Sequence, residues 1–332
     1  MRILVVGGAG YVGSHTVAHL VAAGNDVTVY DDLSTGHAES VHGCRLIVGS
    51  LHDTDRLTTL MREGDVDAVM HFAAFALVGE SVTDPAKYYS NNVAGSLSLL
   101  EAMRAADVRC LVFSSTTATY GQPEHVPIRE TEPQQPINPY GFSKLVVERM
   151  MADYAVAYGL GYAALRYFNA AGAAASGQLG EDHDPETHLI PLVLKVALGQ
   201  REAVTVFGDD YDTPDGTCIR DYVHVDDLAD AHARALEQIE DGSGLCVNLG
   251  SGTGASVWEI IEACRRVTGH KIPANAGPRR AGDPPRLVAD VSLASRLLGW
   301  QPRHSVIEHI VATAWRWHAS HPLGYRSAPG TG

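Results

Sequence analysis

The sequence predicts an α/β fold in which a doubly wound parallel sheet is followed by a smaller mixed α/β domain. Three observations lead to this prediction. The first half of the chain alternates short apolar runs with helical patterns, which is typical of βαβ units. A glycine-rich turn separates the first apolar run from the first helical pattern. After Asn169 the alternation stops, and short strands and helices follow without a regular order.

The first domain is expected to span residues 1–170 and the second residues 171–332. The segment at about residues 222–250 ends in an apolar run and is a candidate for return to the first sheet. The small-residue segment from Ala170 to Gly180 is expected to be a flexible connection. In chain order, strands are expected at residues 3–6, 27–30, 46–48, 68–71, 110–113, 162–166, 204–207 and 246–249, and helices at 11–23, 85–105, 140–158, 189–198 and 225–239.

The composition is that of an ordinary globular protein, with 45% hydrophobic and 19% charged residues among 332. The formal charge of −14 argues against a nucleic-acid-binding surface, which needs a basic patch. The apolar start stops at Gly7 and is too short for a signal or membrane helix, so no membrane partner is expected. The five cysteines show no close pairing, which indicates free thiols and a cytoplasmic location. No metal site is expected, because the histidines form no recognisable ligand set, His183, His188, His309 and His318 included.

A glycine pattern follows the first expected strand directly. Gly7, Gly10 and Gly13 have the spacing Gly-x-x-Gly-x-x-Gly and open the first helix. Glycines here allow a tight turn and a close approach of the backbone to a pyrophosphate, and the helix N-terminus favours phosphate groups. The pattern alone is weak evidence, because many strand–turn–helix junctions are glycine-rich for packing. Its place between a strand and a helix is the one found in Rossmann-like dinucleotide-binding domains.

The end of the second strand carries Asp31, eighteen residues after Gly13. A carboxylate there accepts hydrogen bonds from an adenosine ribose and repels a 2′-phosphate. The segment from Asp32 to Ala38 holds no Arg or Lys that would attract that phosphate. The alternative is a turn aspartate with a structural role. Together with the glycine turn, Asp31 favours NAD over NADP as the cofactor.

Tyr140 and Lys144 lie four residues apart in an expected helix that begins near Pro139, so both side chains project from one face. At about 6 Å and an effective dielectric of about 20, the ammonium favours the phenolate by about 2–3 kcal/mol, which lowers the tyrosine pKa by about two units. Such a pair moves a proton near neutral pH. Thr116 adds a hydroxyl where the fifth strand ends, at the edge where ligands bind. Each feature alone also has a structural explanation, a surface phenol or a polar turn.

Together these features resemble the extended short-chain dehydrogenase/reductase superfamily, and more closely its UDP-glucose 4-epimerase family. The resemblance runs from Met1 to about Trp300. Its discriminating parts are the runs around Asn169 and Arg220, because they lie outside the cofactor machinery. The matching segments are Val78-Gly79-Glu80-Ser81, Tyr88-Tyr89-Ser90-Asn91-Asn92-Val93, Leu165-Arg166-Tyr167-Phe168-Asn169, Phe207-Gly208-Asp209-Asp210-Tyr211, the segment from Asp215 to Val225, and Arg279-Arg280-Ala281-Gly282-Asp283.

The resemblance implies an isomerase that inverts C4 of the sugar in UDP-glucose and UDP-galactose through a transient 4-keto sugar, with tightly bound NAD. It implies that Tyr140 moves the proton of the 4-hydroxyl, that Lys144 holds the nicotinamide ribose and that Thr116 positions the 4-oxygen. The implied cofactor contacts are Gly7, Gly10, Tyr11, Val12, Gly13, Asp31, Asn92, Tyr140 and Lys144. Besides Thr116, the implied substrate contacts are Asn169, His188, Leu189, Phe207, Arg220, Tyr222, Arg280 and Asp283, of which the two arginines would clamp the diphosphate.

Three alternatives stay open. An epimerase of UDP-N-acetylglucosamine or a UDP-pentose is one, because Leu287 falls at a wall position whose size in the family decides whether N-acetylated sugars fit. Another nucleotide-sugar enzyme is less favoured, because a 4,6-dehydratase typically carries an Asp-Glu pair where this chain has Thr117 and Ala118. A non-catalytic NAD sensor would often lose the tyrosine or the lysine, and both are present. The resemblance also implies a homodimer in which the helices at residues 85–105 and 140–158 pair across a two-fold axis.

Overall fold

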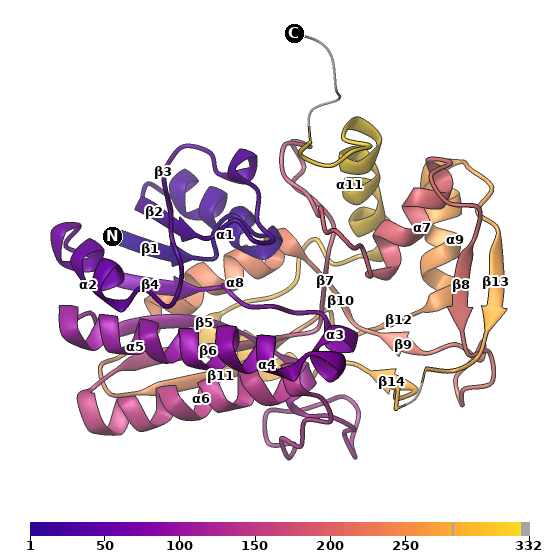
Figure 1. The fold of residues 1–332 in the computed structure, drawn as a ribbon. Helices are drawn as coiled ribbons and strands as arrows, with labels where there is room; N and C mark the ends of the chain where they lie inside the picture. Colours follow the sequence, from indigo (N-terminus) through magenta and orange to yellow (C-terminus); the bar gives the residue numbers. More distant parts are fainter. Residues whose placement is uncertain (281, 327–332) are drawn as a thin grey trace, which may run out of the picture.

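The computed structural model, which describes residues 1–280 and 282–326, places a large sheet and its helices beside a smaller group of strands and helices (Figure 1). The large sheet has seven strands, and every neighbouring pair in it is parallel. This confirms the predicted doubly wound sheet. In spatial order its strands are β11 (Gly244–Leu249), β6 (Gly161–Tyr167), β5 (Cys110–Thr116), β4 (Ala68–His71), β1 (Arg2–Val6), β2 (Asp26–Asp31) and β3 (Arg45–Val48).

Helices cover both faces of this sheet. Central strands such as β1 are buried on both sides, which is why they consist of continuous apolar runs. One hydrophobic core joins the sheet to α1, α8 and α10, and a second core joins the opposite face to α2, α5 and α6. The helices are α1 (Tyr11–Ala22), α2 (Thr54–Glu63), α3 (Val78–Thr83), α4 (Pro85–Tyr88), α5 (Gly95–Ala106), α6 (Pro139–Tyr158), α8 (Val225–Glu237) and α10 (Ser292–Leu298), with a π-helical turn at Tyr89–Ala94 between α4 and α5.

The chain enters the smaller group after β6 and then returns to the large sheet. β11 pairs with β6 in parallel register, with Val247 opposite Leu165. The smaller group has its own hydrophobic core between three helices and short strands. Its elements are β7 (Asn169–Ala171), α7 (Leu189–Ala197), β8 (Val204–Phe207), β9 (Ile219–Arg220), β10 (Tyr222–His224), β12 (Ala255–Ser256), α9 (Val257–Thr268), β13 (Ala274–Gly277), β14 (Arg286–Leu287) and α11 (Ile307–Ser320).

The expectation of a flexible connection from Ala170 to Gly180 is wrong. Ala173 and Leu179 are buried, at 0% and 4% exposure. A Cβ placed on Gly180 would lie 2.2 Å from the ring of Trp317 in α11. The small residues of this segment therefore serve close packing against a helix rather than freedom of the backbone.

The helix expected at residues 85–105 is divided into α4, the π-helical turn at Tyr89–Ala94 and α5. The other expected strands and helices are present, and their ends differ from the expected ones by three residues at most. In the part of the chain that the structure describes, each helix is too short or too polar to cross a bilayer. The five cysteines are free thiols.

Candidate active site

The glycine turn lies between β1 and α1 and leaves the backbone exposed to a ligand. Gly7 has a φ of +81°, and a Cβ there would lie 2.3 Å from the backbone nitrogen of Ala73. A Cβ on Gly13 would lie 2.2 Å from the carbonyl oxygen of Gly7, so only glycine allows α1 to approach the strand end this closely. Gly10 caps α1 without a side-chain hydrogen bond, which leaves the first N–H groups of the helix for an anionic ligand. The turn therefore fits a dinucleotide pyrophosphate.

Asp31 ends β2 beside this turn and is 8% exposed. Its two carboxylate oxygens accept hydrogen bonds from the backbone nitrogens of Ala9 and Leu33, each at 2.9 Å. Burial raises the pKa of Asp31, and these two hydrogen bonds oppose that shift. The backbone contacts hold the carboxylate in place, and its remaining lone pairs can accept ribose hydroxyls.

The start of α6 brings Tyr140 to the end of β5. Asn138 caps the helix by accepting a hydrogen bond from the backbone nitrogen of Gly141 at 2.8 Å, and Pro139 follows at the first helical position. Gly141 lies so close to the strand-end loop that a Cβ on it would be 2.4 Å from the carbonyl oxygen of Ala118. This contact seats the first turn of α6 against the end of β5, and Tyr140 and Thr116 line the same cavity.

Lys144 lies one turn further along α6 and is 4% exposed. Its Nζ donates a hydrogen bond to the carbonyl oxygen of Ser114 at 2.8 Å and lies 4.7 Å from the ring centre of Phe113. Burial lowers the pKa of Lys144 to about 7. Burial also raises the pKa of Tyr140 well above its ordinary value. In the chain alone, therefore, the pKa of Tyr140 shifts in the direction opposite to the expected one, because desolvation dominates and the neighbouring Tyr167 and Tyr88 add to it.

A cavity of about 440 Å³ lies at the carboxyl ends of the large sheet and extends to the smaller group of elements. It connects the glycine turn and Asp31 with Tyr140 and with the start of α7. The structure brings most of the sequence-predicted site residues to its wall, namely Gly7, Gly10, Tyr11, Val12, Gly13, Asp31, Thr116, Tyr140, Asn169, His188, Leu189, Arg220 and Tyr222.

Five predicted site residues are absent from this wall: Lys144, Asn92, Phe207, Arg280 and Asp283. Lys144 lies beneath Tyr140, as described. Asn92 is 2% exposed, and both ends of its amide are bound within the chain. Its Oδ1 accepts from the backbone nitrogen of Phe75 at 2.9 Å, and its Nδ2 donates to the carbonyl oxygen of Phe75 at 3.0 Å. Asn92 thus holds the loop after β4, whereas the preceding Asn91 lines the cavity.

The remaining three form two contacts, one with Arg220 and one with each other. The Arg220 guanidinium is 13% exposed and donates to the carboxylate of Asp283 and to the carbonyl oxygen of Pro284. The guanidinium of Arg280 stacks on the ring of Phe207, 4.4 Å from its centre. Of the two arginines, Arg220 therefore lines the cavity, whereas Arg280 is exposed on the surface.

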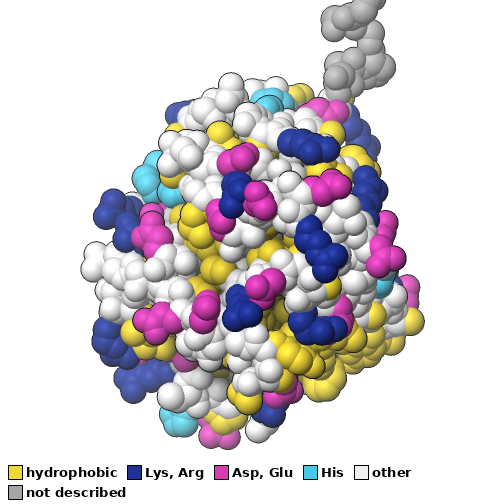
Figure 2. Space-filling view, turned by 90° about the vertical axis from the view of Figure 1, so that its left-hand side faces the viewer, with side chains coloured by type: hydrophobic (Ala, Val, Ile, Leu, Met, Phe, Trp, Pro, Cys, Tyr) yellow, Lys and Arg dark blue, Asp and Glu magenta, His cyan; other side chains and the backbone are white. Residues whose placement is uncertain are grey.

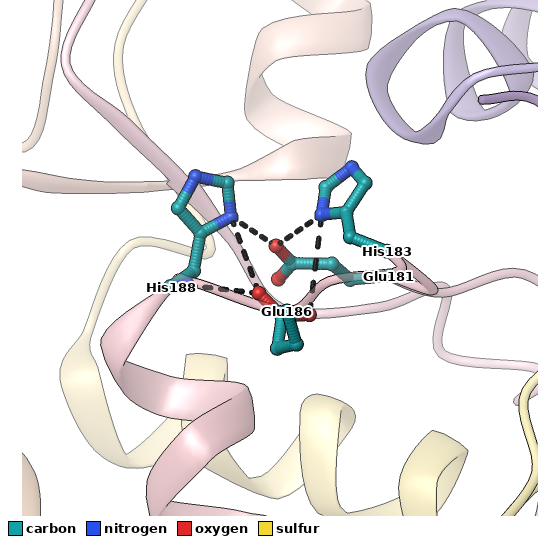
Figure 3. A group of neighbouring side chains, drawn as sticks. All are labelled: Glu181, His183, Glu186 and His188. Carbon is teal, nitrogen blue, oxygen red and sulfur yellow. Dashed lines mark hydrogen bonds and ion pairs between the residues drawn. The ribbon is translucent and has the colours of Figure 1, made fainter. Parts of the chain in front are cut away.

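The sequence indicated no ligand set among the histidines, His183 and His188 included, yet the loop that precedes α7 brings these two together with Glu181 and Glu186. We call Glu181, His183, Glu186 and His188 the loop cluster (Figure 3). Both histidine Nδ1 atoms donate toward the carboxylate of Glu181. Burial opposes protonation of His188, but the charge of Glu181 outweighs it and raises the pKa of His188 to about 9. The spacing Glu-x-His-x-x-Glu-x-His was the available signal in the sequence.

Comparisons with known proteins agree with this geometry. Residues 3–250 match the model of the NAD dependent epimerase/dehydratase family. The UDP-glucose 4-epimerase of Halalkalibacterium halodurans is 54% identical over 326 residues, which cover 98% of each chain. The crystal structure of UDP-glucose 4-epimerase from Brucella ovis in complex with NAD has a TM-score of 0.92 at 53% identity and covers 95% of this chain and 97% of that one. The enzyme from Bifidobacterium longum in complex with NAD⁺ and UDP has a TM-score of 0.93 at 38% identity, over 98% and 100% of the two chains.

Proposed function

This chain belongs to the NAD dependent epimerase/dehydratase family, and we propose that it interconverts UDP-glucose and UDP-galactose as an NAD-dependent 4-epimerase. The observation that carries the proposal is the cavity of about 440 Å³ at the carboxyl ends of the large sheet. It places a phenol and a hydroxyl, Tyr140 and Thr116, between a dinucleotide-binding turn and the cationic side chain of Arg220. NAD bound at the turn supplies a reversible hydride acceptor for C4 of the sugar.

Tyr140 would accept the proton of the sugar 4-hydroxyl as the 4-keto sugar forms, and would return a proton to the 4-oxygen when hydride adds back to the opposite face of C4. Its high pKa in the chain alone means that a nearby positive charge is needed to hold the phenolate. Lys144 supplies part of that charge from beneath, while its Nζ stays anchored on Ser114. Thr116 orients the 4-oxygen through its hydroxyl, which already accepts a hydrogen bond from the backbone nitrogen of Ala118 at 3.2 Å.

The UDP part is held by residues of the smaller group. We assign the diphosphate to Asn169 and Arg220, with Arg280 closing on it from the surface. Asp283 keeps the Arg220 guanidinium in place before substrate arrives. Tyr222 supports this wall, because its strand pairs with β7 so that Tyr222 lies opposite Asn169. Firm binding of the remote nucleotide lets the keto sugar turn without leaving the site.

A 4-epimerase of another UDP-sugar is the second candidate, and the side chain that separates it from the first is Leu287. This side chain lines the cavity, and leucine is of intermediate size for a wall that decides whether an N-acetyl group fits.

The domain division that we adopt assigns NAD to residues 1–170 with β11, and the nucleotide sugar to residues 171–332.

The test is to incubate purified protein, without added cofactor, with UDP-galactose and to follow the anomeric signals by NMR. We expect conversion to UDP-glucose by the wild type and loss of turnover in Tyr140→Phe, with NAD and substrate binding retained. Tyr158→Phe, on the exposed end of the same helix, is the matched control and should stay active. Turnover by Tyr140→Phe at the wild-type rate would contradict the assignment. UDP-N-acetylgalactosamine and UDP-arabinose, run in parallel, identify the preferred sugar.

We further propose that the enzyme is a cytoplasmic homodimer of galactose metabolism. The free thiols of all five cysteines support a reducing compartment. Figure 2 shows hydrophobic side chains gathered at its lower right margin. This margin corresponds to the front of the view in Figure 1, where α5 and α6 lie. Exposed residues of this region include Leu97 in α5 at 42% and Val156 in α6 at 91%. Light scattering should give the mass of two chains, and a mass of one chain would exclude the dimer.

A further inference from the structure

The four side chains of the loop cluster converge on one point. The proposed reaction gives them no ligand in common. All four lie within eight residues of the chain, between β7 and α7. One ligand atom from each residue can be chosen so that the four atoms lie within 4.8 Å of one another. Figure 3 shows the Nδ1 side of both histidine rings turned toward the two carboxylates. Such convergence of nitrogen and oxygen donors is the arrangement that a metal ion requires.

The separations within the loop cluster lie on either side of those in a zinc site. In tetrahedral Zn²⁺ sites the bonds to nitrogen and oxygen are about 2.0–2.2 Å, so neighbouring ligand atoms lie about 3.3–3.5 Å apart. Here Nδ1 of His183 is 3.1 Å from Oε1 of Glu181 and 3.9 Å from Oε2 of Glu186. Nδ1 of His188 is 3.9 Å from Oε1 of Glu186 and in direct contact with Oε1 of Glu181. Binding would draw His188 and Glu181, which are in direct contact here, apart and would bring the most widely spaced of the four atoms, which lie within 4.8 Å of one another, closer together.

The donor set selects the metal. Ca²⁺ and Mg²⁺ prefer oxygen ligands throughout, whereas two imidazoles with two carboxylates suit Zn²⁺. Charge also balances, because the two carboxylates carry −2 in total and the side chains of Glu181 and Glu186 are only 4% and 3% exposed. Buried carboxylates need a partner of opposite charge. Without a metal, the two protonated histidines provide this positive charge. Zn²⁺ would take the place of the two protons on their Nδ1 atoms.

The ligands are held from outside the cluster as well. Oε1 of Glu186 accepts hydrogen bonds from the backbone nitrogens of Thr187 and His188, at 2.7 and 2.8 Å. The backbone at Glu181 is fixed through its carbonyl oxygen, which accepts a hydrogen bond from the indole nitrogen of Trp317 at 3.1 Å. Such outer contacts orient metal ligands and increase affinity.

The position of the cluster connects it to the substrate. Its members Glu181, His183 and His188 line the same cavity as Tyr140, and His188 directly precedes α7. We propose that the loop cluster binds Zn²⁺ and that zinc and the UDP-sugar exclude each other, because both use His188. The exclusion part rests on the proposed function, whereas metal binding does not.

Binding is tested by titrating chelator-treated protein with ZnCl₂ in a calorimeter. We expect one saturable site per chain in the wild type, and affinity lower by more than about tenfold in His183→Gln and in Glu186→Gln. Glu186→Gln keeps a side-chain oxygen that can accept the two backbone hydrogen bonds, so it tests the site even if His183→Gln fails to fold. His125→Gln is the matched control, because His125 also lies beside a glutamate but is 80% exposed and outside the cavity. Its zinc affinity should equal that of the wild type.

Competition is tested by NMR turnover with and without ZnCl₂. We expect zinc to raise KM for UDP-galactose with little effect on kcat, full recovery with EDTA, and no effect of zinc on His183→Gln relative to the metal-free activity of that same variant. Absence of saturable binding, or binding that persists in both variants because zinc goes to the thiols, would overturn the zinc site. Inhibition that lowers kcat alone would overturn the exclusion. If no UDP-sugar is turned over, the proposed function fails while calorimetry still decides on the zinc site.

Discussion

Arg166 in β6 donates a hydrogen bond from Nη2 to Oε2 of Glu148 in α6 at 2.6 Å, and both side chains are only 6% exposed. The same carboxylate accepts a hydrogen bond from Oγ of Ser115 at 2.5 Å. Glu148 lies one turn beyond Lys144, so this ion pair fixes α6 against β5 and β6 directly below the proposed site. The position of Tyr140 relative to the sheet therefore depends on the buried Arg166–Glu148 ion pair, which is not part of the cavity wall.

Replacing Glu148 with Gln should destabilise the protein by about 3–5 kcal/mol, because the buried guanidinium would lose its counter-charge. Urea denaturation followed by circular dichroism measures this change. Glu308→Gln is the control, since Glu308 pairs with Arg266 on the surface with both side chains more than half exposed, and such pairs contribute less than about 1 kcal/mol. Equal effects of the two substitutions would contradict a structural role for the buried pair.

Gly13→Ala should weaken retention of NAD by at least about 1.4 kcal/mol, a factor of ten, because the new Cβ would lie 2.2 Å from the carbonyl oxygen of Gly7 and push α1 away from the turn. The NAD released from denatured, purified protein measures retention. Gly79→Ala is the matched control, since a Cβ there meets no atom within 4 Å. Wild-type NAD content in Gly13→Ala would show that the turn tolerates the methyl group.

The features that could be predicted from the sequence are those that depend on neighbours in the chain. The period of apolar residues predicted the strands and helices of the large sheet, and a few residues in a row predicted the glycine turn and the capped start of α6. The cavity then follows from parallel strands, because all their carboxyl ends meet at one edge. Hence residues at strand ends, such as Asp31 and Thr116, could be placed correctly in advance.

The features that could not be predicted depend on distant parts of the chain. The amide of Asn92 is bound by Phe75 and Ser143, which are 17 and 51 residues away. The direction of the Tyr140 shift depends on burial, which the helical spacing of Tyr140 and Lys144 does not reveal. The small residues from Ala170 to Gly180 indicate a flexible segment when only the sequence is considered. Their role in packing depends on the contact of Gly180 with Trp317, which lies far away in the chain.

The stability of the NAD-free protein should depend on pH through Lys144. Burial lowers its pKa from 10.5 to about 7, so above pH 7 the folded chain loses a proton that the unfolded chain keeps up to about pH 10.5. Unfolding then takes up a proton, and this contribution makes the folded state more stable as pH rises, by up to about 1.4 kcal/mol per unit. Below about pH 7 both states hold the proton, and the cost of the buried charge is constant.

The measurement is urea denaturation of NAD-free wild type and Lys144→Met at about pH 7 and about pH 9. Other groups contribute equally to both proteins, so the difference between them isolates Lys144. We expect the variant to be the more stable at the lower pH and its advantage to shrink as pH rises. Parallel pH profiles would mean that the lysine pKa in the folded chain is close to that of the unfolded chain.

Leu287 should control which sugar the cavity accepts. It lies in β14 opposite Arg220 of β9 and lines the cavity. Leu287→Ala removes apolar volume from this wall, and each methylene of fit is worth about 1–3 kcal/mol in discrimination. We expect kcat/KM for UDP-N-acetylgalactosamine to rise at least about tenfold relative to that for UDP-galactose. Leu297→Ala, an exposed leucine of α10, should leave the ratio unchanged. If the Leu287→Ala ratio also equals that of the wild type, another part of the wall sets the size of the accepted sugar.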